Sequence, residues 1–254
     1  MGSATRPPLR AALHPAVETG PAGVRRRTAL VLVLTVGAAS TDALSYLGLG
    51  HVFPANMTGN TVLLAVDVTT SDYASAVRSL LALAGFVIGA VAAAGITEPD
   101  EDGDRPARTM HALLVEFLVL LVAAVWWLLT GTDRPENAAQ LGVIALFGMA
   151  MGAQSAAMAR LDVPVSTTYI TGTWTQVSTW LAALLPGGSR RRPAAPGHSD
   201  HILQLAVLAC YLAAALGAGY LFRFAGRAVA FVPCATTAAV CTIGLTRTTS
   251  QPHA

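Results

Sequence analysis

The sequence predicts an all-α fold, a polytopic transmembrane helix bundle. Of the 254 residues, 54% are hydrophobic and 12% are charged, whereas soluble domains carry about a quarter charged residues. The charges are also segregated, because they crowd the first 27 residues, short intervening stretches and the far end. The runs between them are uncharged or nearly so and have membrane-spanning length, so we expect the protein to lie in a lipid bilayer.

Eight hydrophobic segments follow one another along the chain. Six are long enough to span a membrane at about 1.5 Å per residue of helix, and two are shorter or interrupted. We expect six long spans over 28–50, 73–96, 109–130, 138–160, 201–223 and 228–246, and two short or broken helices over 54–70 and 165–186. We also expect an internal repeat of two halves, about 28–130 and 138–246.

The membrane domain is predicted to cover 28–246. Residues 1–27 are rich in Pro, Gly and Ala and lack an apolar period, which predicts a disordered cytoplasmic tail. A second short tail covers 247–254. The apolar run after Arg27 is longer than the core of a signal peptide and contains an Asp, so we expect it to be retained as the first span.

Two arginine triplets indicate the orientation of the protein in its membrane. Residues 25–27 and 190–192 are all Arg and flank hydrophobic runs, where basic residues mark the cytoplasmic side. The N-terminus is then cytoplasmic, and an even number of crossings separates the triplets. Eight crossings fit, with the loop 97–108 outside. Six crossings fit as well, with 54–70 and 165–186 re-entrant and that loop inside.

Two short polar stretches look like copies of each other. They cover 54–61 and 167–175, and each combines Gly with hydroxyl or amide side chains. Each follows, at about the same interval, an apolar run with one strongly polar residue, Asp42 in the first half and Gln154 in the second. At membrane depth, a broken helix is tolerated only where it faces protein or a wet cavity. The pair therefore predicts a functional centre.

Asp42 is the sharpest single candidate for a functional residue. It lies near the middle of the first span, with Ser45 and Tyr46 at i+3 and i+4 on the same predicted face. An ionised carboxylate there costs several kcal/mol unless it is paired or wet, which predicts a substrate, ion or proton site. The alternative is a hydrogen-bonded Asp that caps the broken backbone near Thr58.

A helix that starts at either polar stretch would present free N–H groups and its positive dipole end to the membrane centre, where an anion could dock. Many secondary transporters build a central site from broken helices in two repeats. The alternative is that these side chains only cap the helix starts. The predicted substrate- or ion-binding set is Asp42, Ser45, Tyr46, Asn56, Thr58, Gly59, Asn60, Gln154, Thr171, Gly172 and Thr173.

Glu116 and His111 form a second candidate group in the 109–130 segment. Both lie within the first turns of the segment, close to where we expect the membrane interface. One interpretation is a proton relay. The other is a pair of interfacial side chains that extend toward water.

Several classes of protein are excluded by the residue pattern. There is no P-loop, GxSxG, HExxH or Rossmann fingerprint, and the basic residues form no nucleic-acid patch, so we expect neither an enzyme nor a nucleic-acid partner. Cys210, Cys234 and Cys241 have no disulfide or zinc spacing, and we expect no metal and no cofactor. The GxxxG pairs Gly85/Gly89 and Gly148/Gly152 favour helix packing within the chain and leave a homo-oligomer open.

The motif residues resemble those of a known family. The Asp42-bearing span followed by residues 52–61 resembles the leading motif of the bacterial YoaK family (domain of unknown function 1275), and the second half agrees over 148–154, 163–164 and 167–173. The resemblance covers about 28–246. It implies a bacterial inner-membrane protein with about six spans, and it implies no substrate.

The combined pattern predicts a small-solute transporter or permease. Its central polar site would lie at the two broken helices, and its partner would be an unknown small solute or ion. The alternative is a non-transporting membrane scaffold, assembly factor or sensor, in which the polar motifs only satisfy the broken helices.

Overall fold

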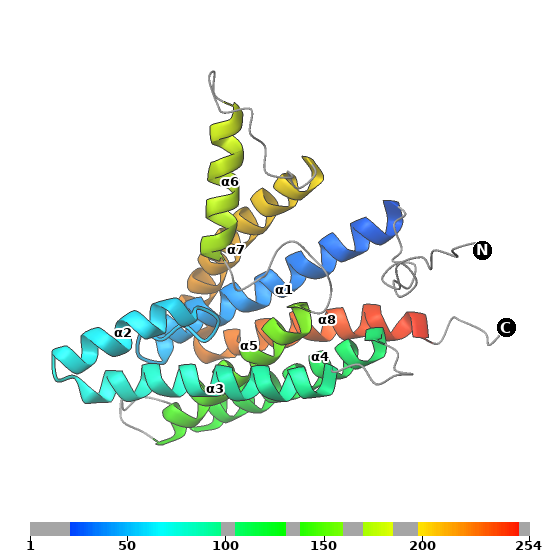
Figure 1. Ribbon diagram of the computed structural model, residues 1–254. Coiled ribbons are helices and arrows are strands. Elements are labelled where there is room, and N and C mark those ends of the chain that lie inside the picture. Colours follow the sequence, from blue (N-terminus) through cyan, green and yellow to red (C-terminus); the bar gives the residue numbers. More distant parts are fainter. Residues whose placement is uncertain (1–20, 98–104, 131–137, 160–169, 185–197, 249–254) are drawn as a thin grey trace, which may run out of the picture.

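A computed structural model describes residues 21–97, 105–130, 138–159, 170–184 and 198–248 of the chain. The regular elements among them are helical, which confirms the all-α prediction (Figure 1). The helices are α1 (Pro21–Gly48), α2 (Met57–Thr69), α3 (Tyr73–Thr97), α4 (Arg105–Thr130), α5 (Ala138–Ala159), α6 (Ile170–Leu184), α7 (His198–Ala225), the short 3₁₀ helix η2 (Gly226–Ala230) and α8 (Phe231–Thr248).

Within the described residues, five segments are long and apolar enough to cross a membrane. They are Gly23–Gly48, Tyr73–Thr97, Arg108–Thr130, Ala138–Ala159 and His201–Ile243, the last of which contains most of α7 and α8. The protein is therefore a multi-pass membrane protein. Helices α2, with 13 residues, and α6, with 15 residues, reach only about 20 and 23 Å, short of the roughly 30 Å hydrocarbon core.

Helix α1 begins at Pro21, before the predicted span. Proline suits the first position of a helix because its backbone lacks an N–H that would have no partner there. The Arg triplet at 25–27 is therefore helical, and the predicted tail is shorter than 1–27. Arg26 Nη2 donates to the Ile243 carbonyl at 3.3 Å, so the start of α1 and the end of α8 lie together at one end of the bundle (Figure 1).

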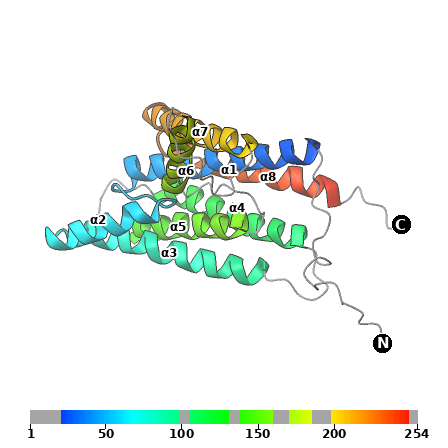
Figure 2. The ribbon, with the colours of Figure 1, turned by 45° about the horizontal axis from the view of Figure 1, so that its top comes forward.

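The long helices form two layers (Figure 2). Helices α1, α7 and α8 make one layer, and α3, α4 and α5 make the other; α4 and α8 pack together across the layers. Each layer therefore combines helices from both halves of the sequence. Helix α2 packs on α3, and α6 contacts α7.

The tightest contact in the bundle is that between α3 and α5, and it depends on glycine. A Cβ atom added to Gly89 would lie 1.9 Å from the carbonyl oxygen of Met149, and one added to Gly152 would lie 2.0 Å from that of Phe86. Only glycine allows two helix backbones to approach so closely. The two GxxxG pairs thus face each other within one chain, as the sequence favoured.

The apolar interior consists of two clusters along the bundle. One surrounds the fully buried Trp127 and Phe147. The other contains Leu34 of α1, Leu113 of α4 and Val240 of α8. Buried polar side chains lie among these clusters, and they form the sites described below.

The turn between α2 and α3 lies outside the long apolar segments and is fixed by Asp72. Its carboxylate accepts hydrogen bonds from the Ser75 hydroxyl at 2.6 Å and the Ser75 backbone N–H at 3.1 Å. These bonds, the side-chain one first, hold the pKa of Asp72 below its usual value. Asp72 thereby acts as the N-cap of α3.

Candidate functional site

The Asp42 carboxylate is buried in the interior and joins three parts of the chain. Its Oδ1 accepts the backbone N–H of Ala55 at 2.7 Å, and its Oδ2 accepts the hydroxyl of Tyr211 on α7 at 2.6 Å. Each oxygen thus has its own donor, which is the arrangement that suits an ionised carboxylate. Asp42 therefore connects α1 both to residues 49–56, the non-helical segment between α1 and α2, and to α7.

The chain reverses direction after α1. Gly50 and His51 both have positive φ, +84° and +66°, a conformation that glycine adopts easily and other residues seldom do. Asp42 lies about 9 Å along the helix axis before the end of α1 at Gly48. The residues after His51 return to the level of Asp42, and there the Ala55 N–H donates to its carboxylate. Helix α2 then runs in the same direction as α1 (Figure 1), so it starts at the depth of Asp42.

Two asparagine side chains form hydrogen bonds with backbone groups of the non-helical segment 49–56 and of the start of α2. Asn60 is fully buried; its Oδ1 accepts the Phe53 N–H at 3.0 Å, and its Nδ2 donates to the Phe53 carbonyl at 2.7 Å. Asn56 is the N-cap of α2 and accepts the Gly59 N–H at 3.1 Å. A Cβ on Gly59 would lie 3.2 Å from both Phe53 and Asn56. Asn56, Gly59 and Asn60 therefore build the helix start.

We expect Asn60→Ala to destabilise the protein more than Thr61→Ala. The first change leaves the Phe53 N–H without its partner, and the Phe53 carbonyl keeps only the Asn56 N–H. A buried donor left unpaired costs about 1–3 kcal/mol. Thr61 is exposed, and its hydroxyl donates to the Met57 carbonyl one turn earlier in the same helix. Thermal unfolding of the purified variants measures the difference. Equal midpoints for the two variants would contradict the structural role of Asn60.

The other candidates of the first motif divide into an inner and an outer group. Ser45 is fully buried, and its Oγ has no hydrogen-bond partner in the described part of the chain. Tyr46 is 41% exposed, and its ring stacks on Phe53 and meets the edge of His51. Thr58 is exposed in the first turn of α2. Ser45 thus joins Asp42 in the interior, whereas Tyr46 and Thr58 do not touch the carboxylate.

Gln154 of α5 is buried and contacts α1 at another depth. Its Nε2 donates to the Leu34 carbonyl at 3.1 Å. Leu34 precedes Asp42 by about 12 Å along the helix axis. Asp42 and Gln154 both fasten α1 to a neighbouring helix, but the structure does not bring them into one cluster.

The residues of the second motif that are described form the first turn of α6. Thr171 is exposed, and its carbonyl accepts the Thr175 hydroxyl at 3.1 Å. Thr173 is buried and Gly172 is partly buried. The preceding part of this motif, through residue 169, lies outside the described residues.

Glu116 and His111 occupy different faces of α4. Glu116 is fully buried, and its Oε1 accepts the hydroxyl of Thr237 on α8 at 2.9 Å. His111 is exposed, because five residues correspond to a rotation of roughly 140° around the helix. The structure therefore places Glu116 in the interior and does not bring His111 to it.

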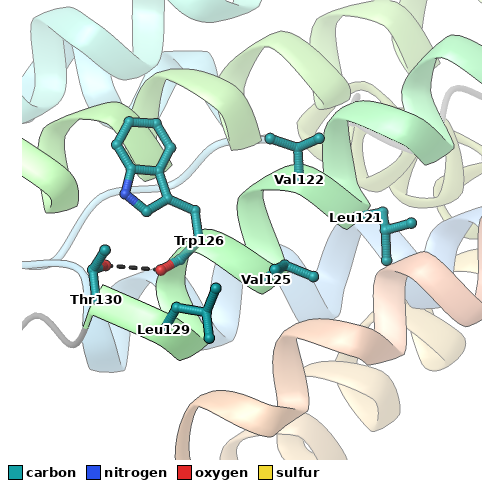
Figure 3. A pocket seen from close by; sticks show the side chains of 6 residues that line it. All are labelled: Leu121, Val122, Val125, Trp126, Leu129 and Thr130. Carbon is teal, nitrogen blue, oxygen red and sulfur yellow. Dashed lines mark hydrogen bonds between the residues drawn. The ribbon is translucent and has the colours of Figure 1, made fainter.

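Asp42 does not line either of the two hollows described here. A groove of about 420 Å³ runs along the outer face of α4 (Figure 3), lined by Leu121, Val122, Val125, Trp126, Leu129 and Thr130. Its apolar lining from a single helix suits contact with lipid. A second hollow of about 510 Å³ lies where α1, α4 and α7 end, beside Trp127, Phe222 and Arg227.

A family model described as "Protein of unknown function (DUF1275)" matches residues 30–243. The chain belongs to the DUF1275 family. The match runs from α1 into α8 and thus includes Asp42, Glu116 and both polar motifs. This finding confirms the family that the motif residues indicated.

The DUF1275 chain is also similar to a curated relative, the UPF0700 transmembrane protein YoaK of Bacillus subtilis (strain 168). The two are 34% identical over 148 residues, which is 58% of this chain and 64% of the relative. The match thus spans less than two thirds of that relative's length. No solved structure matches the chain significantly.

Sequence reasoning missed the partners that this DUF1275 chain supplies to its buried acids. Tyr211 is an isolated hydroxyl-bearing residue in an apolar run, and Thr237 belongs to a Thr pair at 236–237 in another; hydroxyl groups in apolar runs are the signal that could have found them. A third polar group was also missed: Gln204 of α7 donates to Gln176 of α6 and lies 3.3 Å from the His201 ring nitrogen. This group fastens α6 to α7.

In the described residues, no group of three or more His, Cys, Asp or Glu side chains is arranged to hold a metal.

Proposed function

We propose that this DUF1275 protein is a proton-coupled permease for a small solute in the bacterial inner membrane, with its central site at Asp42. The observation that carries the proposal is the buried Asp42 carboxylate, which accepts hydrogen bonds from Ala55, in the non-helical segment 49–56, and from Tyr211. A carboxylate at membrane depth is costly to keep and commonly serves an ion or proton pathway. Uncharged side chains are sufficient to bond the backbone groups of this segment, as Asn56 and Asn60 do at the start of α2.

The packing of the helices supports an inverted repeat as the frame of this permease. Exchanging α1 with α5, α3 with α7 and α4 with α8 preserves the contacts, because α1 packs on α7 and α8 as α5 packs on α3 and α4. The members of each pair run in opposite directions (Figure 1). Such repeats, with a broken helix in each half, are a common transporter design.

The proposed topology has six crossings, with α2 and α6 as half-helices. Both ends of the membrane domain then lie on the cytoplasmic side, as the Arg triplets indicate. In this topology the loop 97–108 is also cytoplasmic, because α3 ends at the same end of the bundle at which α1 begins (Figure 1). This is the second of the two schemes that fit the sequence.

The proposed cycle centres on the two donors of Asp42. A proton on Oδ2 turns that oxygen into a donor, so Tyr211 becomes the acceptor of this hydrogen bond and its own hydroxyl hydrogen is released. A small polar solute with an acceptor oxygen could then bind the released Tyr211 hydroxyl hydrogen.

Reconstitution into liposomes tests this function. A pH-sensitive dye inside the vesicles, combined with light scattering, follows the entry of acetate, lactate, glycerol, urea and ammonium in turn. We expect at least one solute to cause both swelling and a pH change that protein-free liposomes lack. Folded, reconstituted protein that produces neither change with any of the five solutes would count against the proposal.

A non-transporting scaffold is the second candidate function, and a specific observation favours it. Asn56, Asn60 and Asp42 satisfy much of the broken backbone from within the chain, and the two hollows lie elsewhere. A scaffold requires no water at the start of α2. Access of aqueous reagents to that point therefore separates the two functions.

A further inference from the structure

Glu116 is a second buried carboxyl group, and Asp42 has no part in its contacts. It lies on α4 between Leu113 and Leu120, where the two apolar clusters meet. Its side chain is fully buried, and in the described part of the chain its only hydrogen-bonded side chain is Thr237 of α8. In such surroundings an ionised carboxylate is costly unless it is paired or fully hydrogen-bonded, so the protonation state of Glu116 must be considered.

The available hydrogens decide which form of Glu116 fits. The Thr237 hydroxyl has a single hydrogen to donate. Its oxygen lies 2.9 Å from Glu116 Oε1 and 3.1 Å from the carbonyl oxygen of Pro233. Glu116 Oε2 has no partner in the described residues. An ionised Glu116 would therefore share one hydrogen with Pro233 and leave its other oxygen bare.

A protonated Glu116 fits the same geometry with both hydrogens used. The acid would donate to Thr237 Oγ, and Thr237 would donate to the Pro233 carbonyl, which forms a continuous chain of two hydrogen bonds. Only a neutral carbonyl oxygen would then lack a partner. Such an oxygen costs far less to bury than a carboxylate.

Among the described residues, the groups that face Glu116 provide no compensating positive charge. On α8, the thiols of Cys234 and Cys241 flank Thr237 on the same face and lie within electrostatic range of Glu116. Both thiols are buried. On α4 itself, the neighbours one turn away are Ala112 and Leu120, both fully buried and apolar.

We propose that Glu116 is a proton-binding site, which holds a proton in the conformation where Asp42 is ionised. The two carboxyl groups differ in their partners, because Asp42 receives two donors and Glu116 receives at most one. Contrasting environments of this kind assign a proton donor and a proton acceptor. The site follows from the geometry of α4 and α8, while its use in coupling rests on the proposed permease function.

Infrared spectroscopy of the full chain in lipid bilayers tests the site directly. A protonated carboxyl group has a carbonyl stretching band that shifts when H₂O is replaced by D₂O. We expect this band at neutral pH in the unmodified protein and in Asp42→Asn, and its loss in Glu116→Gln. A band that survives in Glu116→Gln, or that disappears only in Asp42→Asn, would overturn the proposal.

A second pair of variants covers the case in which Glu116→Gln does not fold. Thr237→Val removes the acceptor of the acid proton, so the band should move to higher frequency. Thr242→Val is the matched control, because Thr242 is exposed on the same helix and its hydroxyl donates to the Ala239 carbonyl of its own helix. Equal spectra for the two threonine variants would contradict the site.

The infrared result is independent of transport. A Glu116 band in a protein that moves no solute would retain the proton site and remove the permease. Proton-coupled solute flux without the band would do the reverse.

Discussion

Replacing Gly152 by valine should prevent formation of the folded protein. A Cβ at this position would lie 2.0 Å from the carbonyl oxygen of Phe86 and 2.9 Å from the backbone N of Ala90. Backbone atoms of a packed helix cannot rotate aside as a side chain can, so α3 and α5 would have to separate. Overpacking commonly costs about 1–3 kcal/mol, and here it would act at the tightest contact of the bundle. Size-exclusion chromatography and thermal unfolding of the purified variant measure the loss.

Gly95→Val and Gly217→Val are the matched controls. A Cβ at either position would have no atom within 4 Å in the described structure. Both variants should therefore yield monodisperse protein with unfolding midpoints close to that of the unmodified chain. An unfolding midpoint of Gly152→Val equal to that of Gly95→Val would contradict the close approach of α3 and α5.

Asp42→Asn should abolish proton-coupled movement of solute while the fold persists. The amide can still accept the Ala55 N–H through its oxygen and donate to the Tyr211 oxygen, so both existing contacts retain a partner. What the variant loses is the group that binds and releases a proton. We expect the pH change in reconstituted vesicles to fall to the level of protein-free liposomes, with an unfolding midpoint close to that of the unmodified protein.

Asp72→Asn is the matched control for Asp42→Asn. Asp72 lies in the turn between α2 and α3, where its carboxylate accepts hydrogen bonds from Ser75, so its loss should leave solute-driven pH changes intact. Asp42→Asn activity equal to that of the unmodified protein across a pH series would exclude Asp42 as the coupling residue.

The helices could be predicted from the sequence because membrane helices follow long apolar runs. The run 73–96 became α3 (Tyr73–Thr97), and 138–160 became α5 (Ala138–Ala159). The shortness of α2 was equally visible, since Gly and amide residues interrupt its run. The start of α1 at Pro21 was not, because the Ala- and Gly-rich tail has no apolar period that would mark a helix.

The site was predictable only in part. The importance of Asp42 followed from a charge in an apolar run, but the capping roles of Asn56 and Asn60 depend on the chain reversal at Gly50 and His51, which residue types alone do not specify. Tyr211 could not be paired with Asp42 from the sequence either. That pairing depends on which helix packs beside α1, and periodicity does not reveal it.

In the permease that we propose, the start of α2 faces a hydrated chamber inside the membrane. The most direct test places single cysteines at Thr58 and Val66 in a background without the three native cysteines, and treats reconstituted protein with a charged, membrane-impermeant thiol reagent. Both side chains are exposed on α2. Val66, about 12 Å further along the helix, is an exposed apolar side chain and should face lipid rather than the chamber. We predict that Thr58→Cys reacts and Val66→Cys does not. An unreactive Thr58→Cys would contradict the hydrated chamber and, with it, the permease.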